Sequence, residues 1–482
     1  MLTCKKEAPY YNLPIFGRDQ VFYALTAQNT LARYNAKDVR TNSSVVNISG
    51  LAAGESLISI DFRPATGELY GISSLNKLYL VDIGSGGVRA VSSTPFYTTT
   101  LGSVVNMDFN PADDRIRIVS NGGQNLRINP ETGALESTDT NLSVTSISAI
   151  AHHNNYAGTT TSTLFDIDAA AKKLYRQDPN LGTLTNIGNL TLDMGTQVAF
   201  DISSANKALA VSKPADSTKL YVIDLNSGKT ELAGKFALGT NIRSIAIPTL
   251  PVAYAVDQAN TLIIFNPTVA PTYYTRAITG LQSGESILGM DVRPLNGQLY
   301  ALGSSSRLYR LNVATGAATL IGTGPFGTIL SGTSFGFDFN PLTDVIRVVS
   351  NTGQNMRIDP NTARVTSDTN FAATANFSAA AFSNNFRTAS STLLYLIDHN
   401  SNKLLTQNLS SGVLTAVGDL KIDLDAANGF DILYQGQDVA YGIFSVGGKT
   451  GLYTINLTTG EATLKYEINR TISAFATGLR FN

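Results

Sequence analysis

The residues best able to do chemistry in this 482-residue chain form a polar cluster that occurs twice. Its first copy begins at Asp108 and its second at Asp338. Two arginines beside Gln and Asn amides could hold a carboxylate, a phosphate or a sugar through paired hydrogen bonds. The candidate ligand-binding residues of the two copies are Arg117, Gln124, Asn125, Arg127, Arg347, Gln354, Asn355 and Arg357.

The same cluster also has a structural interpretation, which is favoured. Asn110, followed by proline and then by Asp114, forms a turn pattern in which the polar side chains bind the backbone and proline fixes φ. Arg117 and Arg127 would then pair across strands with Asp108 or Asp114. Arginines at the mouth of an open channel would favour ligand binding, whereas arginines in buried ion pairs would favour the structural role.

A second set of polar residues consists of aspartates near the ends of expected inner strands. Its members are Asp61, Asp108, Asp201, Asp291, Asp338 and Asp431. If these strands converge, the carboxylates could bind Ca²⁺ through hard oxygen ligands. More often, an Asp at a strand end accepts backbone N–H bonds from the next turn. We therefore expect no metal and no cofactor, with calcium as the alternative.

The sequence gives little support for catalysis. His152 and His153 are adjacent, so their rings would point to opposite faces of a strand and make a poor metal pair. The second half has Phe382 and a serine at the matching positions. A serine–histidine triad, a zinc site and a phosphate-binding glycine loop also lack support. No catalytic residue is assigned, and an enzyme would have to rely on Asp, Glu, Arg and Tyr.

The elements that must position these residues come from a tandem duplication. Asp61-Phe62-Arg63-Pro64 returns as Asp291-Val292-Arg293-Pro294, and the cluster at Asp108 returns at the same offset. We expect a tether over residues 1–17 and two halves over residues 18–250 and 251–482.

Each half has a finer repeat of about 45 residues, which is typical of a four-stranded propeller blade. In one repeat the expected strands are 57–62, 68–72, 77–83 and 87–92, with period-2 alternation, β-branched residues and turns of Gly, Asn and Ser. Helical periodicity is missing from all long stretches. The fold class is therefore all-β, a β-propeller of ten four-stranded blades.

Blade closure has two solutions. Residues 21–48 supply three strands without an inner strand, and residues 242–247 supply an inner strand without partners in the same half. Joining them removes exposed sheet edges and gives two five-bladed rings, which we favour. The short junction Pro248-Thr249-Leu250-Pro251 instead suits one ten-bladed ring, because it would pair strands that are neighbours in sequence.

Aromatic residues on connections between blades are further candidates for ligand contact, since loops carry binding on propellers. They are Phe96, Tyr97 and Phe326. The alternative, which is favoured, is that each loop folds down onto its own blade.

The Asp-Phe-Asn-Pro…Arg…Ser-Asn…Gly-Gln-Asn…Arg…Pro signature resembles that of domain-of-unknown-function family 4394, a bacterial and mostly extracytoplasmic family. The resemblance covers one copy in about residues 18–250 and another in about 251–482. It implies a propeller-like fold and supplies no activity, substrate or catalytic residue.

The net charge of the chain and the setting of Cys4 indicate which partners and which cellular location to expect. The net charge of −1 argues against nucleic acid or an anionic membrane surface as partner. Cys4 is the only cysteine, and Cys4-Lys5-Lys6 resembles the start of a mature Bacteroidota lipoprotein, in which this Cys receives lipid. The alternative is an incidental Cys on a disordered tail. We expect a cell-envelope protein, held at the outer membrane, periplasm or cell surface, whose one link to the membrane is that lipid.

These observations favour an extracytoplasmic module that binds an unknown ligand or protein without catalysis. The alternative is a lyase- or hydrolase-type enzyme that acts on a carbohydrate or peptide at the channel, with calcium assisting. A purely structural envelope component is a third class.

Overall fold

The computed structural model describes residues 19–372 and 375–480. Within these ranges all regular elements are strands, and no described segment is a helix, so none could cross a membrane as an apolar helix. Cys4 and the expected tether 1–17 lie outside the described residues.

In the described part of the chain, forty strands form ten four-stranded antiparallel sheets, as the sequence predicts. The strands of the first half are β1 (Val21–Thr26), β2 (Thr30–Asn35), β3 (Ser44–Asn47), β4 (Leu57–Phe62), β5 (Leu69–Ser73), β6 (Leu78–Val81), β7 (Val88–Ala90), β8 (Val105–Asn110), β9 (Arg115–Ser120), β10 (Asn125–Ile128), β11 (Leu135–Thr138), β12 (Ala149–His152), β13 (Leu164–Asp168), β14 (Lys173–Gln177), β15 (Leu184–Asn189), β16 (Val198–Ile202), β17 (Ala208–Ser212), β18 (Lys219–Ile223), β19 (Thr230–Lys235) and β20 (Ile242–Ala246).

The strands of the second half are β21 (Ala253–Asp257), β22 (Thr261–Phe265), β23 (Tyr274–Ala277), β24 (Ile287–Val292), β25 (Leu299–Gly303), β26 (Arg307–Leu311), β27 (Ala318–Ile321), β28 (Phe335–Asn340), β29 (Val345–Ser350), β30 (Asn355–Ile358), β31 (Val365–Ser367), β32 (Phe377–Phe382), β33 (Leu394–Asp398), β34 (Lys403–Gln407), β35 (Leu414–Asp419), β36 (Ala426–Tyr434), β37 (Asp438–Val446), β38 (Lys449–Ile455), β39 (Ala462–Ile468) and β40 (Ile472–Thr477).

Local turn chemistry sets the boundaries within a sheet. Between β5 and β6, Asn76 has φ 56°, a left-handed conformation that Asn tolerates well. Between β6 and β7, Asp82 Oδ1 accepts hydrogen bonds from the backbone N–H groups of Gly84 (3.0 Å) and Ser85 (2.8 Å). Such turns are short, so strands that are adjacent in sequence pair as hairpins.

One sheet in each half joins distant parts of the chain. β20 pairs with β1, so that Ile245 lies opposite Ala24, and β40 pairs with β21, so that Ala476 lies opposite Tyr254. The inner strands of the first half contact one another in the cyclic order β4, β8, β12, β16, β20 and back to β4. In the second half, the cyclic order is β24, β28, β32, β36, β40 and back to β24. The arrangement is propeller-like in both halves.

Apolar side chains fill the spaces between successive sheets. Tyr70 and Ile72 of β5, for example, pack with Phe109 of β8 and Ile118 of β9, and all four are fully or almost fully buried. Burying both faces of each sheet in this way accounts for strands whose residues are nearly all apolar or small. The apolar core of each half therefore lies between its successive sheets.

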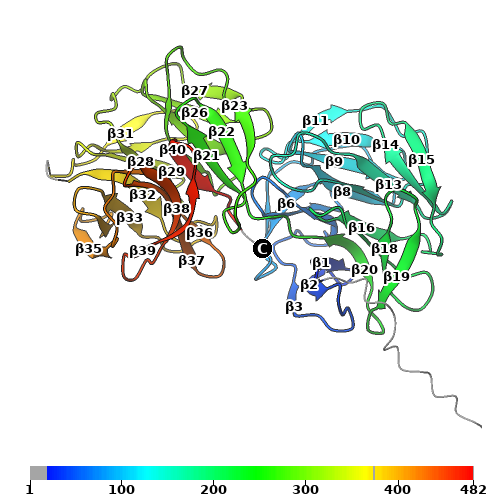
Figure 1. Ribbon diagram of the computed structural model, residues 1–482. Helices are drawn as coiled ribbons and strands as arrows, with labels where there is room; N and C mark the ends of the chain where they lie inside the picture. Colours follow the sequence, from blue (N-terminus) through cyan, green and yellow to red (C-terminus); the bar gives the residue numbers. More distant parts are fainter. Residues whose placement is uncertain (1–18, 373–374, 481–482) are drawn as a thin grey trace, which may run out of the picture.

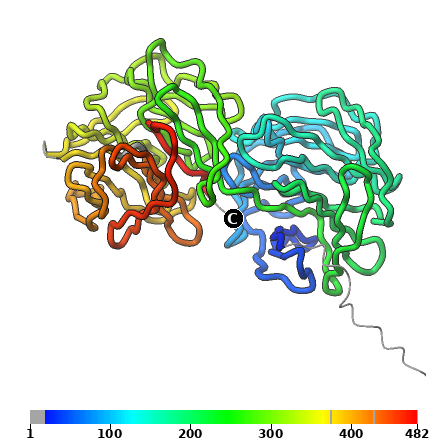
Figure 2. Tube along the Cα trace, in the orientation of Figure 1, coloured from blue at the N-terminus to red at the C-terminus, as the bar shows by residue number. Residues whose placement is uncertain are grey.

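The two halves lie side by side and are joined through residues 247–252 (Figures 1 and 2). Tyr254 donates a hydrogen bond to the carbonyl oxygen of Ala65 across the boundary, at 2.7 Å. Arg480 makes an ion pair with Asp82 at 2.5 Å, and its backbone N–H donates to Thr66 O at 3.0 Å. The halves are thus held by specific contacts as well as by the connecting chain.

Candidate functional site

In the first half, the predicted arginines meet a carboxylate that the sequence analysis did not assign to them. Arg117 of β9 lies directly opposite Arg127 of β10, and both bind Asp139, which follows β11. The Nη1–Oδ2 distance from Arg117 is 2.5 Å, and the Nε–Oδ2 distance from Arg127 is 2.9 Å. Burial opposes ionisation of Asp139, but hydrogen bonds from Arg127 and Arg117 outweigh it and hold its pKa below the usual value. Of the two partners expected for these arginines, Asp114 instead binds Arg63 at 2.5 Å and Asp108 accepts a hydrogen bond from His152 N.

A second buried layer completes this first cluster. Gln177, in the amide orientation that satisfies both groups, donates to the two carboxylate oxygens of Asp166 at 2.8 and 3.2 Å. Burial raises the pKa of Asp166 well above its usual value, although the nearby Arg117 opposes that shift. Asn125 accepts a hydrogen bond from Arg117 and donates to the carbonyl oxygen of Pro179. In the first half, the side chains of Asn125, Gln177 and Asp166 thus lie behind the arginine pair and bind one another or the arginines.

The second half repeats the arginine arrangement. Arg347 of β29 donates to Asn355 Oδ1 and binds Asp368, each at 2.6 Å, and Arg357 of β30 binds Asp368 at 2.7 Å. Asp368 follows β31 as Asp139 follows β11. The Arg357 side chain is 44% exposed, against 32% for Arg127, so the second copy is more open to solvent.

The layer behind these arginines differs between the halves. Leu396 occupies the position of Asp166 in the repeat, and Phe382 occupies that of His152, while Gln407 retains the position of Gln177. Arg347 Nε and Gln407 Oε1 are buried and have no hydrogen-bond partner among the described residues. Two buried polar atoms on neighbouring sheets of the second half are thus without a partner among the described residues.

A pocket of about 770 Å³ lies beside these two groups, between the sheet β28–β31 and the sheet β32–β35. Its charged lining comes from Arg347, Arg357 and Asp368. Its other polar lining residues include Asn340, Thr343, Asn355, Asn370, Gln407, Ser410 and Ser411, and its apolar lining includes Phe371, Phe382, Leu409 and Leu414. The lining of the pocket thus combines charged groups, short polar side chains and apolar side chains.

Two of the predicted site residues serve turns instead. Gln124 accepts a hydrogen bond from Ser120 Oγ in the turn between β9 and β10. In the matching turn, Gln354 donates to Ile329 O at 2.9 Å and accepts from Ser331 N at 2.9 Å. Neither glutamine is among the residues that line the pocket.

The three aromatic candidates pack against their own half. Phe96 is 5% exposed and Phe326 is 4% exposed, each within an apolar core cluster, and Tyr97 packs against the cluster that holds Phe96. The connections fold down over the sheets because this removes large apolar rings from water. The rings of Phe96 and Phe326 are therefore not available to a ligand on the surface.

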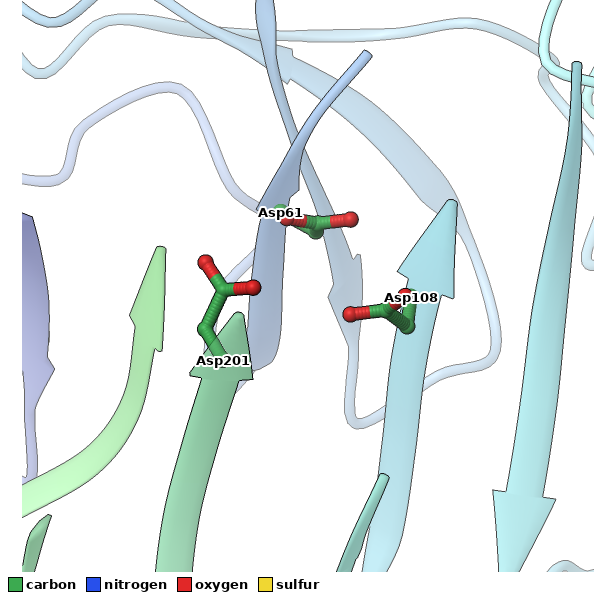
Figure 3. A group of neighbouring side chains, drawn as sticks. All are labelled: Asp61, Asp108 and Asp201. Atoms are coloured by element: carbon green, nitrogen blue, oxygen red, sulfur yellow. The ribbon is translucent and has the colours of Figure 1, made fainter. Parts of the chain in front are cut away.

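The inner-strand aspartates converge in two triads, which are Asp61, Asp108 and Asp201 in the first half and Asp291, Asp338 and Asp431 in the second. Figure 3 shows the carboxyl groups of the first triad turned toward one another from separate strands. Within each triad, one oxygen per residue lies within 4.8 Å of the others, and all six residues are buried.

Each triad member contacts the backbone of the next sheet. Asp61 accepts from Phe62 N at 2.8 Å and from Phe109 N at 2.7 Å, so it links β4 to β8. Asp201 accepts in the same way from Ile247 N at 2.5 Å. Burial raises the pKa of Asp61 well above its usual value, and the nearby Asp108 adds to the shift. The oxygen spacing would suit a divalent cation, and the hydrogen bonds show that these carboxyl groups also serve to join neighbouring sheets.

His152 belongs to this set rather than to a catalytic one. Its backbone N–H donates to Asp108 Oδ1, and its Nδ1 lies 2.8 Å from the same oxygen. Burial lowers the pKa of His152 to about 3, and burial raises the pKa of Asp108. The ring is therefore neutral at pH 7, and the contact is a hydrogen bond rather than an ion pair.

Sequence reasoning missed Asp368, Gln407 and Phe371 as pocket residues. A usable signal exists for the first two, since both recur between the halves, Asp368 as Asp139 and Gln407 as Gln177. Asp368 follows β31 and Gln407 lies in β34, so only the folded arrangement of the sheets brings them close to the arginines of β29 and β30.

Comparisons with solved structures give distant likenesses. The extracellular domain of a putative hybrid two-component system from B. thetaiotaomicron has 12% identity and a TM-score of 0.27, with 94% of this chain and 71% of that chain covered. PorZ, a surface component of the type-IX secretion system of Porphyromonas gingivalis, has 13% identity and a TM-score of 0.27, with coverages of 93% and 65%. Neither likeness bears on function, and no curated protein matches the chain.

A family model supplies the identification. The model described as "Domain of unknown function (DUF4394)" matches residues 30–246 and again residues 261–476. Each match falls within one half of the chain, which confirms the tandem duplication. With nine-tenths of its length matched in two consecutive copies, this chain belongs to the DUF4394 family.

Proposed function

We propose that this protein is an extracytoplasmic binding module that holds a small ligand in the pocket of its second half. The scaffold is two five-bladed β-propellers. The pairing of β20 with β1 and of β40 with β21 supports two rings, because one ten-bladed ring would pair β20 with β21. The cyclic contacts of the inner strands support the same arrangement.

The observation that carries the binding function is the difference between the halves. Behind the arginines of the first half, Gln177 binds Asp166, whereas the arginines of the second half line a pocket of about 770 Å³. That volume lies within the roughly 300–1,000 Å³ range of small-molecule sites. Unsatisfied buried polar atoms beside an open pocket are the feature expected of a site whose last partner is a ligand.

The chemistry of the pocket supports binding rather than catalysis. Asp368 is the sole carboxylate among the described residues that line it. Burial works against its ionisation, but Arg357 and Arg347 hold the pKa of Asp368 below its usual value. A carboxylate so strongly paired is a weak general base. The pocket therefore recognises charge and hydroxyl groups without a group suited to proton transfer.

The extracytoplasmic location is supported by the Cys4-Lys5-Lys6 sequence, which resembles a lipoprotein start. Cells that produce the full-length precursor should attach an alkyne-tagged fatty acid to the protein, and Cys4→Ala should remove that label. Labelling that survives the substitution would overturn the lipid anchor.

The binding function is tested by blocking the pocket. A library of polar metabolites and oligosaccharides is screened by thermal shift, and hits are measured by calorimetry. Ser410→Trp places a large ring at the exposed pocket rim, and Asn180→Trp is its matched control at the same position of the first half. We expect Ser410→Trp to abolish binding of a hit and Asn180→Trp to leave it unchanged. A library without any saturable ligand, or hits indifferent to Ser410→Trp, would contradict the proposal.

A further inference from the structure

The first half shows what the pocket of the second half lacks. In the first half, the Asp166 carboxylate binds the amide of Gln177 and lies within electrostatic reach of Arg117. The second half keeps the amide as Gln407 and the guanidinium as Arg347 but has Leu396 in place of the acid. Position 396 therefore holds an apolar side chain where the first half holds a carboxyl group, while the neighbouring amide and guanidinium occur in both halves.

The charges that line the pocket do not balance. Arg347 and Arg357 are both paired with Asp368, the one acidic residue among the described residues of the lining, which leaves one positive charge in excess. Arg347 is 7% exposed, and its buried Nε has no partner among the described residues. Because a buried, incompletely paired charge is unfavourable, a bound monoanion would be stabilised here.

A carboxylate suits this site better than a phosphate. The charge deficit is one unit, and Asp368 would repel the second negative charge of a phosphate dianion. A planar carboxylate also matches the geometry of a guanidinium and can accept from a side-chain amide at the same time.

The remainder of the pocket indicates what carries the carboxylate. Asn340, Asn370, Ser410 and Ser411 provide short side chains that both donate and accept hydrogen bonds, as vicinal hydroxyls require. The Phe371 ring is also part of the lining and offers an apolar surface of the kind that packs against the C–H face of a sugar ring. This combination favours a hydroxylated ring over an aliphatic acid.

We propose that the pocket binds an acidic sugar, a hexuronate unit of an oligosaccharide, whose carboxylate lies toward Arg347 and Gln407. The inference rests on the proposed binding function and names its ligand class. In this view the first half, where Gln177 and Asp166 bind each other, is the structural half, and the second half binds its ligand through the excess positive charge of the pocket.

The test compares tri-galacturonate, maltotriose and glucose 6-phosphate by calorimetry on the full-length protein. Gln407→Glu places a carboxylate beside Arg347, and Gln177→Glu is the matched control in the first half. We expect tri-galacturonate to bind at least about ten-fold tighter than either other probe, with binding weakened about ten-fold or more by Gln407→Glu and unchanged by Gln177→Glu. Thermal unfolding of both variants checks that they remain folded.

Leu396→Asp provides a second variant, because it restores the carboxylate of the first half, and it should also weaken tri-galacturonate binding. Equal or tighter binding of maltotriose or glucose 6-phosphate, still lost in Ser410→Trp, would overturn the acidic-sugar inference and leave the binding function standing. If tri-galacturonate does not bind but the library yields another pocket ligand, the inference fails alone. If no compound binds, both fail.

Discussion

At the scale of single residues, the two halves use one arginine cluster in two ways. His152 and Asp166 make the interior of the first half polar at this point, whereas Phe382 and Leu396 make the second half apolar. The polar pair and the apolar pair are both buried, so the fold does not require one pair rather than the other. The proposed binding function accounts for the difference, because it requires an open site beside Arg347 in the second half alone.

The sequence predicted these arginines as site residues but not their partners. Arg117 was expected to pair with Asp108 or Asp114, yet Asp108 faces the neighbouring inner strands and Asp114 faces Arg63. Asp139, the actual partner, reaches Arg117 from the end of β11, two strands further along the chain. Partner choice of this kind depends on side-chain direction across several strands, which spacing in sequence does not encode.

The aspartate triads make a prediction about pH. A carboxyl group whose folded pKa is raised stabilises the fold below the unfolded pKa, near 4, and that contribution is lost as the pH rises through the folded pKa. Burial, with the nearby Asp291 and Asp431 adding to it, raises the pKa of Asp338 well above its usual value. Asp338→Asn should therefore increase the free energy of unfolding at pH 7 by about 1 kcal/mol and flatten its dependence on pH above about 4.

Asp291→Asn is the contrasting variant in the same triad. Asp291 uses both carboxylate oxygens to accept backbone N–H groups, from Val292 at 2.7 Å and Phe339 at 2.8 Å, and an amide can replace only one of them. We expect it to destabilise the protein by about 1–3 kcal/mol in urea unfolding. A stabilising Asp291→Asn, or an Asp338→Asn that steepens the pH dependence, would contradict the assigned hydrogen bonds.

Metal removal is a separate test of the triads. Because their carboxyl groups already bind backbone N–H groups, we expect a chelator to change the melting temperature by less than about 2 °C. Added CaCl₂ should likewise leave it unchanged. A chelator-induced fall of about 5 °C or more, reversed by calcium, would show that the triads hold a structural ion.

At the scale of elements, the strands were the most predictable feature. Period-2 alternation and turn residues predict β4 at residues 57–62, as the structure has it. The pairing of distant strands was also predictable, because each half begins with strands that lack an inner strand and ends with an inner strand that lacks partners. The loops were predictable in part: the favoured interpretation, that each loop folds down onto its own blade, is confirmed by the burial of Phe96 and Phe326.

Contact between neighbouring sheets makes a prediction about one glycine. A Cβ at Gly188, in β15, would overlap the carbonyl oxygen of Ser227 in the turn between β18 and β19. Gly188→Ala should lower the free energy of unfolding by about 1–3 kcal/mol, because backbone must move to admit the methyl group. Gly324→Ala is the control, since a Cβ there meets nothing within 4 Å, and its melting temperature should match the unmodified protein. Equal melting temperatures for the two variants would refute the tight packing of these sheets.

At the scale of the whole molecule, each half contains all four strands of each of its five sheets. Residues 18–250 and 251–482, produced separately, should therefore both fold, with cooperative urea unfolding and near-ultraviolet circular dichroism. Loss of the contacts at Tyr254 and Arg480 should make each half less stable than it is in the full chain. Halves that fold only when mixed would contradict two separate rings.

The strand pairing also sets the order in which the two halves can close as the chain emerges with its N-terminus first. Once residue 246 is free, β20 can pair with β1, and the first half needs nothing that follows it. The second half keeps an unpaired edge on β21 until residues 472–477 arrive. A nascent chain interrupted near residue 460 would thus contain a closed first half and a second half with an unpaired strand edge that can pair with other chains. Quality-control proteases would then find an exposed edge on the second half alone.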